Sequence, residues 1–319
     1  MSTGAEVDAA LSRAIAFLGR RQLPSGEIPV QRSGLDERTV FPTALAAHAL
    51  SFSQEAHSLH ERALDFLRDE VDESGLWRHW ARGHAQWRRI PPDLDDTSCA
   101  SGALVRAGRV APDNRALVLS NRNREGLFFT WKLTWRQWRH PIVLAGFFTQ
   151  TVCRPFDVDP VVNANLIYYL GKIPETRPVI DHLLTVLREG REGECDKWYY
   201  NHFVIWYLFS RALHDVAPEA GTLILPKLLT AVPSSALEHA LSLCSMLYWK
   251  GVPPIDAIVQ SQLVWGGWPS APVYGGGRLH RRNGAYPAPS PHSATWGSEE
   301  LTTAFCIEAL SRWKGATCP

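Results

Sequence analysis

A repeated sequence unit constrains the fold of this chain more than any other feature. Residues 14–28 and 63–77 match at a constant offset of 49, and Gly26 of the first copy pairs with Gly75 of the second. The end of the unit returns at residues 262–268. Each copy has the pattern of a helix, a glycine turn and a second helix. Tandem units of this kind bury their apolar faces against their neighbours, so the repeat predicts a stack of helical hairpins.

The hairpins contain two kinds of helix. The second helices are rich in Ala, Ser, Cys and Leu with few charges, as expected of helices that are buried on most sides. They begin near Pro42, Asp96, Pro160, Tyr199, Leu237 and Ser298. The first helices carry more charge and show apolar residues at i, i+3 and i+4, as outer helices do. They span residues 6–22, 59–71, 114–120, 177–189, 223–232 and 255–263.

Six inner and six outer helices in alternation predict an all-α fold, an α/α barrel in a single domain over residues 1–319. An open superhelix of the same hairpins is the alternative. Closure is favoured because the last inner helix, residues 299–313, is as apolar as the others. Strand signals are almost absent.

Two stretches do not fit the hairpin period. Residues 122–156 form a long aromatic insertion that contains Trp131, Trp135 and Trp138 with basic residues between them. Long loops in compact domains are usually functional, and this one is too apolar for disorder. We expect a lid over the barrel mouth, a membrane-surface contact or a homodimer contact. Residues 274–296 also have the composition of a loop, and their basic cluster (Arg278, His280, Arg281 and Arg282) is either an anion contact or a solvated loop.

Three carboxylates, Asp93, Asp95 and Asp96, lie within four residues, directly after Pro91 and Pro92. Proline favours an extended entry, and acids at the start of a helix cap its free N–H groups. One such acid needs no other explanation. Three exceed what a cap requires, and crowding them raises at least one pKa, because the cluster cannot hold three negative charges at low cost. The cluster is therefore a candidate Brønsted acid.

The inner helices of a barrel begin at the same end, so residues near their starts are expected to line one cavity. The candidates for substrate contact are acids, amides and aromatics: Asp157, Asp159, Asn163, Trp198, Tyr199, Tyr200, His202, Trp296 and Glu299. Helix capping is the alternative role for Asp157 and Asp159, and core packing is the alternative for the two tyrosines.

Composition and missing motifs exclude other classes. A net charge of +1 offers no electrostatic case for nucleic acid. The six cysteines form no CxxC pair, which favours reduced thiols in a cytoplasmic protein, with peripheral membrane contact still open. The first residues lack a signal-peptide pattern, and no apolar run reaches the roughly 18 residues of a membrane span. The sequence has no P-loop, GxGxxG or GxSxG motif, and the spacing of Cys195, Asp196 and His202 matches no common zinc site.

Residues 93–97 resemble the Asp-x-Asp-Asp-Thr motif of class II terpene cyclases, which include squalene-hopene cyclases and bacterial diterpene cyclases. Residues 262–268 are similar to the Gln-x-x-x-Gly-x-Trp repeat motif of that family, and residues 22–28 are a degenerate copy. The resemblance implies the toroid of terpene cyclases and prenyltransferases. It also implies that Asp95 is the general acid that protonates an alkene or epoxide of an isoprenoid, while Asp93 and Asp96 hold its geometry and proton.

The expected substrate is a small isoprenoid, in particular a prenyl diphosphate. Protonation requires no cofactor, but Mg²⁺ on Asp157 and Asp159 could accompany a diphosphate. The Asp-Asp-x-x-Asp pattern of ionisation-type cyclases and the Asp-x-Cys zinc pattern of protein prenyltransferases are both missing. Bacterial relatives usually have two barrels, and this chain has room for one. A non-catalytic barrel that binds an isoprenoid or a partner, and an isoprenoid transferase, are the alternative functions.

Overall fold

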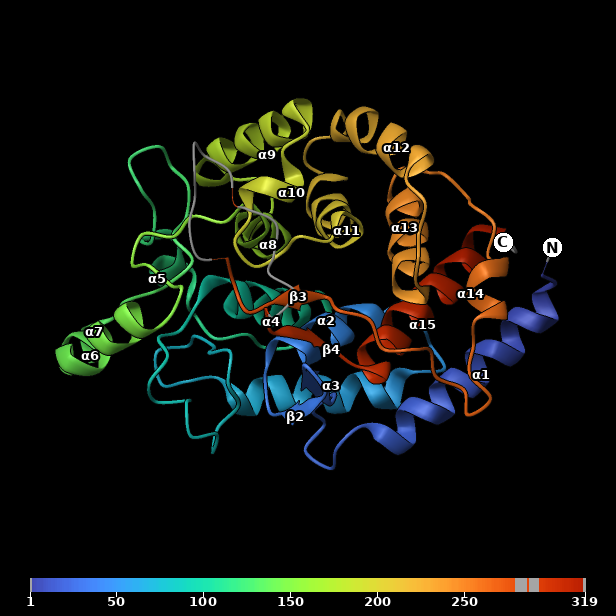
Figure 1. Cartoon of the computed structure of the whole chain (residues 1–319), viewed down its shortest axis with the longest axis horizontal. Helices are drawn as coiled ribbons and strands as arrows, with labels where there is room; N and C mark the ends of the chain where they lie inside the picture. Colours follow the sequence, from blue (N-terminus) through green and yellow to red (C-terminus); the bar gives the residue numbers. More distant parts are fainter. Residues whose placement is uncertain (1, 279–285, 287–292, 318–319) are drawn as a thin grey trace.

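Two concentric sets of helices form the fold (Figure 1). The structure is a computed structural model that describes residues 2–278, 286 and 293–317. The inner helices are α2 (Phe41–Leu50), α4 (Leu94–Arg106), α8 (Pro160–Leu170), α11 (His202–Leu213), α13 (Ala236–Tyr248) and α15 (Glu299–Thr317). Each inner helix packs against the next, and α15 packs against α2. The ring is therefore closed, which confirms the predicted α/α barrel over the open superhelix.

Six outer helices surround this ring. They are α1 (Gly4–Arg21), α3 (His57–Glu70), α5 (Arg115–Leu119), α9 (Arg177–Glu189), α12 (Ala220–Thr230) and α14 (Asp256–Gln260). The short elements η1 (Pro174–Thr176) and α10 (Glu192–Cys195) lie in the connections. All ten residues of inner α2 are buried, whereas outer α9 buries one face only. The predicted division into six apolar inner and six amphipathic outer helices is confirmed for the residues described.

The repeat encodes one turn, built in the same way each time. Gly26, Gly75 and Gly266 have φ values of 91°, 79° and 100°, which favour glycine. A Cβ on Gly26 would lie 2.0 Å from the carbonyl oxygen of Arg62, on the next outer helix. The turn needs glycine for its conformation and for this close approach, which is why glycine recurs in the repeat.

The glutamine of the repeat joins neighbouring hairpins. Nε2 of Gln22 donates to the carbonyl of Leu59 at the start of α3, 3.0 Å away. Nε2 of Gln262 donates to the carbonyl of Ala10 on α1, 2.8 Å away. This second contact links the last repeat to the first helix, so the same motif that stacks adjacent hairpins also closes the barrel.

A fourth copy of the turn lies at the start of the predicted insertion. The backbone of Asn123 bonds to Leu127 and that of Gly126 to Asn123, as at Leu23, Glu27 and Gly26. The insertion therefore starts later than residue 122, where the sequence predicts it, and this copy was missed because Arg122 and Phe128 stand where the last copy has Gln262 and Trp268. The segment that departs from the hairpin period follows it and contains α6 (Trp135–Trp138) and α7 (Pro141–Gln150).

Helices α6 and α7 stand out from the ring at the left of Figure 1. The side chains of Trp135 and Trp138 are 60% and 62% exposed, whereas Trp131 is buried. In the part of the chain described, none of the helices has both the length and the apolarity that a membrane crossing requires.

A small antiparallel sheet, which the sequence analysis missed, borders the barrel mouth. Its strands are β1 (Val30–Arg32), β2 (Leu35–Glu37), β3 (Tyr274–Gly275) and β4 (Thr295–Gly297), in the order β2-β1-β4-β3. Trp296 pairs with Arg32 on one side and Tyr274 on the other. Strands of two or three residues are too short for an alternating pattern to reveal them. His280, Arg281 and Arg282 of the predicted basic loop lie outside the described residues.

Candidate active site

The acid motif lies at the start of inner helix α4. Asp93 is the N-cap in an extended conformation, and its Oδ1 accepts a 2.8 Å hydrogen bond from the backbone N–H of Asp96. The backbone N–H of Leu94 donates to Thr130, which ties the loop to the segment before α6. Asp93 thus has the ordinary capping role that its position suggests. The other two acids are free for other roles.

All three acids line one cavity, and Asp95 is the most exposed of them. Asp93 and Asp96 are 4% and 2% exposed, whereas Asp95 retains partial exposure. Its Oδ2 accepts a 2.5 Å hydrogen bond from the hydroxyl of Tyr199, and its Oδ1 accepts one of 2.5 Å from Nδ2 of Asn165. Burial raises the pKa of Asp95 to about 7, and the charge of Asp93 adds to the rise, although both hydrogen bonds act against it. Near neutral pH this carboxyl therefore carries a proton in a large fraction of molecules.

The carboxyls of Asp93 and Asp96 interact directly. Burial raises the pKa of Asp96 well above its ordinary value, and the charge and hydrogen bond of Asp93 raise it further. Burial also raises the pKa of Asp93, although the N–H groups it caps oppose the shift. The pair therefore holds a proton beside Asp95 and keeps the cluster from carrying three negative charges.

A cavity of about 410 Å³ opens over Asp95, within the range of small-molecule sites. Its wall is mainly aromatic: Phe41, His79, Trp80, Trp131, Phe147, Trp198, Tyr199, Tyr274 and Trp296. Tyr274 and Trp296 stack with their centroids 5.7 Å apart. Thr130, Gln150, Thr151 and Arg32 add polar groups. A partly exposed acid at an aromatic wall can transfer a proton to a bound apolar molecule.

His79 adds a neutral base to this wall. Burial lowers the pKa of its imidazole to about 3, so the ring is uncharged at neutral pH. It packs edge-on against Trp296, with the centroids 4.9 Å apart. The cavity therefore contains an acid and a neutral nitrogen base within one set of aromatic rings.

Three of the nine predicted substrate-contact residues line this cavity: Trp198, Tyr199 and Trp296. The structure places Asp157, Asp159 and Asn163 elsewhere. Oδ1 of Asp157 forms a buried ion pair of 2.5 Å with Nζ of Lys197. Asp159, fully buried, accepts hydrogen bonds from Thr130 Oγ1 (2.6 Å) and the Lys197 backbone (3.1 Å). These acids hold the loops before α8 and α11 together.

Asn163 has a structural role that the repeat explains. Its Oδ1 accepts a 2.9 Å hydrogen bond from the backbone N–H of Phe128, two residues after Gly126. Trp77 and Trp268 also lie two residues after the glycine of their turns. Their backbone N–H groups donate to the hydroxyls of Thr97 on α4 and Thr303 on α15. Asn163 is therefore the anchor of the fourth turn to its inner helix.

Tyr200, His202 and Glu299 also lie outside the cavity of Asp95. Tyr200 and His202 line a separate hollow beside Asn201 and Glu238. Glu299 accepts a hydrogen bond of 3.0 Å from Nε1 of Trp265 and lies in another surface hollow with Arg20 and Arg21. Successive side chains in an extended segment point to opposite sides, so Tyr199 faces Asp95 while Tyr200 faces away.

The predicted Mg²⁺ site at Asp157 and Asp159 is not supported by the oxygens present. Lys197 occupies one carboxylate, and Thr130 with the Lys197 backbone occupies the other. Among the described residues, the group spaced to hold a metal is His57, His60 and Glu61 on outer helix α3, and none of the three lines the cavity of Asp95. We assign no metal to the acid site.

Asn165, His79, Trp80 and Tyr274 belong to the site but were not predicted. His79 and Trp80 follow Trp77 of the second repeat, and extending the repeat toward the mouth could have indicated them. Asn165 has no such signal. It lies two residues after the predicted Asn163, on the opposite side of α8 because two helical residues differ by about 200°.

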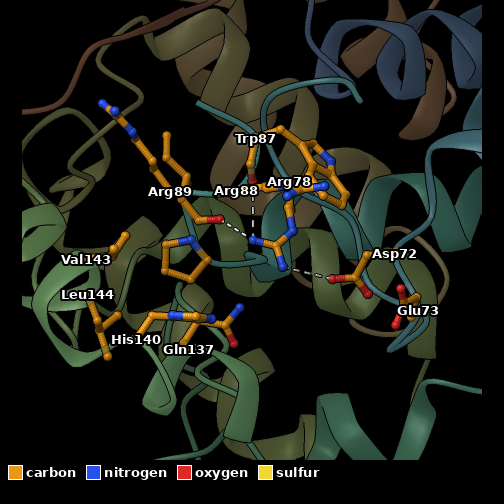
Figure 2. A pocket seen from close by; sticks show the side chains of 12 residues that line it. Asp72, Glu73, Arg78, Trp87, Arg88, Arg89, Gln137, His140, Val143 and Leu144 are labelled. Atoms are coloured by element: carbon orange, nitrogen blue, oxygen red, sulfur yellow. Dashed lines mark hydrogen bonds and ion pairs between the residues drawn. The ribbon is translucent and has the colours of Figure 1, made fainter. Parts of the chain in front are cut away.

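A second cavity, of about 470 Å³, lies behind the acid loop and is lined by Pro91, Ile90 and one face of α7. Figure 2 shows Arg78 at its centre, between Trp87 and Asp72. The Arg78 guanidinium bonds to the Ile90 carbonyl (2.5 Å) and Asp72 (3.2 Å) and lies 5.0 Å from the Trp87 ring. These contacts brace the loop that carries the acids. None of the three motif acids lines this cavity, so the smaller one is the candidate site.

Comparisons with known proteins support the fold. No protein-family profile and no curated sequence matches the chain. A crystal structure of a protein from Actinoplanes matches with a TM-score of 0.73 and 18% identity over 97% of this chain and 99% of that one. The type II terpene cyclase MstE from Scytonema matches with a TM-score of 0.72 and 16% identity over 98% and 99%. An MstE variant was solved with geranylgeranyl dihydroxybenzoate, its substrate (TM-score 0.71, 15% identity, 98% of both chains).

The ent-copalyl diphosphate synthase from Streptomyces platensis matches with a TM-score of 0.53 and 16% identity, over 86% of this chain and 50% of that one. The predicted family resemblance therefore holds at the level of the fold. The single barrel described here matches 99% of the MstE chain, so a one-barrel chain with this fold is known.

Proposed function

We propose that this protein is a class II terpene cyclase that starts a carbocation cyclisation by protonating an alkene or epoxide of an isoprenoid. The observation that carries the proposal is Asp95 itself. It is the most exposed of the three motif acids that line the aromatic cavity, and its pKa is raised to about 7. A carboxylic acid protonated near neutral pH and aimed at an apolar cavity suits general acid catalysis.

The proton balance of the step follows from the contacts of Asp95. The O–H bond of the acid breaks, a C–H bond forms on the alkene, and the substrate becomes a carbocation. The carboxylate left behind accepts hydrogen bonds from Tyr199 and Asn165. Hydrogen bonds of this kind stabilise the charged form most, so they lower the free energy of the product side of the proton transfer.

The aromatic wall of the cavity can then stabilise the carbocation of the substrate. The faces of Trp198, Tyr274 and Trp296 offer negative electrostatic potential without bonding to the cation as an oxygen base would. We propose His79 as the group that accepts the final proton, because it is neutral and lies on the same wall. Asp93 and Asp96 retain the role expected of them. They hold the geometry of the loop, and the proton they share limits the negative charge beside Asp95.

The substrate class rests on the wall and on the relatives. MstE binds geranylgeranyl dihydroxybenzoate, an isoprenoid joined to an aromatic acid. We propose a prenylated substrate whose chain fills the aromatic cavity and whose polar head lies near Arg32 at the sheet. Arg32 is already paired with Glu37 over 2.9 Å, which fits a weakly charged head better than a diphosphate. The prenyl diphosphate remains the alternative.

A substrate panel tests the proposal. Geranyl, farnesyl and geranylgeranyl diphosphates and geranylgeranyl dihydroxybenzoate would each be incubated with the parent and with Asp95→Asn, and the products analysed by mass spectrometry and NMR. We expect a cyclic isomer from at least one substrate with the parent and none with the variant. Tight binding without any cyclic product from the parent would favour the non-catalytic isoprenoid-binding barrel.

The sequence predicted a lid, a membrane-surface contact or a homodimer contact for the stretch that contains the protruding helices α6 and α7. Phe147 and Gln150 of α7 line the cavity of Asp95, while Trp135, Trp138 and Ile142 are exposed. Residues 126–156 contain no Asp or Glu. We propose that this segment borders the substrate entrance and rests against an anionic lipid surface, which apolar and basic side chains favour.

A further inference from the structure

Arg211 of α11 lies in the barrel core beneath the acid. Its side chain is 2% exposed, and its guanidinium lies 4.1 Å from the centroid of the Tyr168 ring. Nη2 donates to Oδ1 of Asn165 over 2.6 Å and to Sγ of Cys99 over 3.4 Å. In the part of the chain that the structure describes, Arg211 forms no ion pair with a carboxylate. A cation buried without a counter-ion is costly, so its position calls for an explanation.

The contact with Asn165 has a definite direction. A guanidinium has only donors, so it can bind only the oxygen end of the amide. The nitrogen end of Asn165 must then face Asp95, and Nδ2 donates to Oδ1 of that acid. Without Arg211, the amide could turn over and accept a proton from Oδ1 instead. Arg211 therefore decides which end of Asn165 meets the acid.

The direction of the amide selects the oxygen that carries the proton. Oδ1 of Asp95 meets an N–H group that can only donate, so a proton on Oδ1 toward Asn165 would have no acceptor, whereas the hydroxyl of Tyr199 beside Oδ2 can turn to accept a proton carried there. Oδ2 lies beside Tyr199, which lines the cavity, whereas Asn165 is fully buried. A proton on Oδ2 is close to the cavity, and a proton on Oδ1 would point into the protein core.

We propose that Arg211 is a positioning residue for proton transfer: by fixing the orientation of Asn165, it confines the transferable proton of Asp95 to Oδ2, the cavity side. This inference rests on the proposed function for its consequence in catalysis, but the orientation itself is a property of the free protein. The inference explains why a cation stands at this buried position, where an apolar side chain would be enough for packing.

Several other groups act on Asp95 and Arg211 and would respond to a change in either. Those around the acid are Asp93, Asp96, Cys99, Asp159, Asp196, Tyr199 and Tyr274. Those around the arginine are His48, Cys99, Tyr168, Tyr207 and Tyr248. Burial raises the pKa of the Cys99 thiol to about 12 and lowers that of His48, so both are neutral near pH 7. Neither group therefore supplies a charge near pH 7 that could replace that of Arg211.

The test compares Arg211→Met, Arg211→Lys and Arg106→Met. Methionine fills the buried space but cannot donate, whereas lysine keeps the charge and a donor. Arg106 lies over the same Tyr168 ring at 4.5 Å and bonds to the Tyr168 carbonyl, but it does not contact Asn165, which makes it the control. Arg211→Gln is the second variant if Arg211→Met does not fold, because its amide no longer imposes an orientation.

We expect Arg211→Met to lower kcat about 10- to 100-fold, the lower part of the range for general acid catalysis, with KM nearly unchanged. Loss of the N–H donated by Asn165 removes a hydrogen bond that lowers the pKa of Asp95, so the alkaline limb of the rate profile should move to higher pH. A merely loosened core would lower the rate without raising this pKa. Arg211→Lys and Arg106→Met should resemble the parent.

Carbon-13 NMR of labelled aspartate carboxyls, with the Asp95 signal assigned by its loss in Asp95→Asn, measures the same pKa without substrate. An upward shift in Arg211→Met but not in Arg106→Met supports the inference even if no substrate is turned over. An unchanged Asp95 pKa in a folded Arg211→Met protein overturns it, and so does a parent-like kcat. If Arg211→Met shows the upward NMR shift but the parent cyclises none of the substrates, only the proposed function is contradicted.

Discussion

Tyr199 donates a 2.5 Å hydrogen bond to Oδ2 of Asp95 across a sequence separation of 104 residues. Together with Asn165, it gives the carboxylate two donors, yet the pKa of Asp95 is still raised to about 7 because burial outweighs both. The same donors stabilise the carboxylate once it has lost its proton. The site therefore combines an acid that carries its proton in a large fraction of molecules near neutral pH with a stabilised conjugate base.

Asp95→Asn should abolish turnover. The amide keeps the size and polarity of the side chain but is far too weak an acid to protonate an alkene, so we expect a loss of at least the ~10²–10⁴-fold ascribed to general acid catalysis. Asp93→Asn and Asp96→Asn should reduce turnover less, because they hold the loop and the shared proton. Steady-state kinetics with analogue-binding measurements checks this. Parent-like turnover by an Asp95→Asn protein that binds the analogue would show that another group donates the proton.

Turnover should fall as the pH rises through about 7. The raised pKa means that the proton-bearing form of Asp95 is populated below that value and lost above it. For the same reason the folded state binds this proton more tightly than the unfolded chain does, so the contribution of Asp95 to stability is present at low pH and lost as the pH rises through 7. A rate profile from pH 5 to 9 tests the first point. A rate that climbs toward pH 9 would exclude Asp95 as an acid.

Tyr199→Phe should move the alkaline limb to higher pH. The hydroxyl of Tyr199 lowers the pKa of Asp95, so its removal should leave the acid protonated over a wider range. At low pH, where Asp95 is protonated in both proteins, kcat should still fall because the conjugate base loses a donor. Tyr200→Phe is the matched control, since Tyr200 lies outside the cavity. Equal effects of the two substitutions would point to a general disturbance of the segment before α11.

Asp157→Asn should act on stability. It leaves the ammonium of Lys197, whose side chain is 4% exposed, without its 2.5 Å partner. Breaking a buried pair from one side costs about 3–5 kcal/mol, whereas replacing both members by apolar residues costs much less. Denaturant unfolding of Asp157→Asn and of the double variant Asp157→Leu with Lys197→Met tests this. A selective loss of substrate binding with unchanged stability would restore Asp157 as a substrate contact.

Trp135→Ser combined with Trp138→Ser should weaken binding to lipid vesicles. Both indoles are exposed on a segment without acids, and indole rings favour the membrane interface. Sedimentation with vesicles containing anionic lipid measures the effect, with Val264→Ser, at a residue 94% exposed elsewhere on the surface, as the control. Unchanged sedimentation together with a change in oligomeric state would assign the segment to the homodimer contact.

The barrel and the position of its acids were predictable because both depend on local chemistry. The glycine of the turn must adopt a positive φ and admit a backbone carbonyl, so it recurs wherever the turn recurs. The apolar inner helices had to meet one another, since no other partner could bury them. Asp93, Asp95 and Asp96 follow two prolines at a helix start, and their crowding raises their pKa in any fold that buries them.

Only the tertiary structure decided which side chains share the cavity with Asp95. Asn163 and Asn165 have the same chemistry and lie two residues apart, but the rotation of α8 in the ring sends one to the Phe128 backbone and the other to the acid. Tyr199 and Tyr200 divide in the same way. The sequence determines which residues an element offers, whereas packing against neighbours from distant parts of the chain determines which of them face inward.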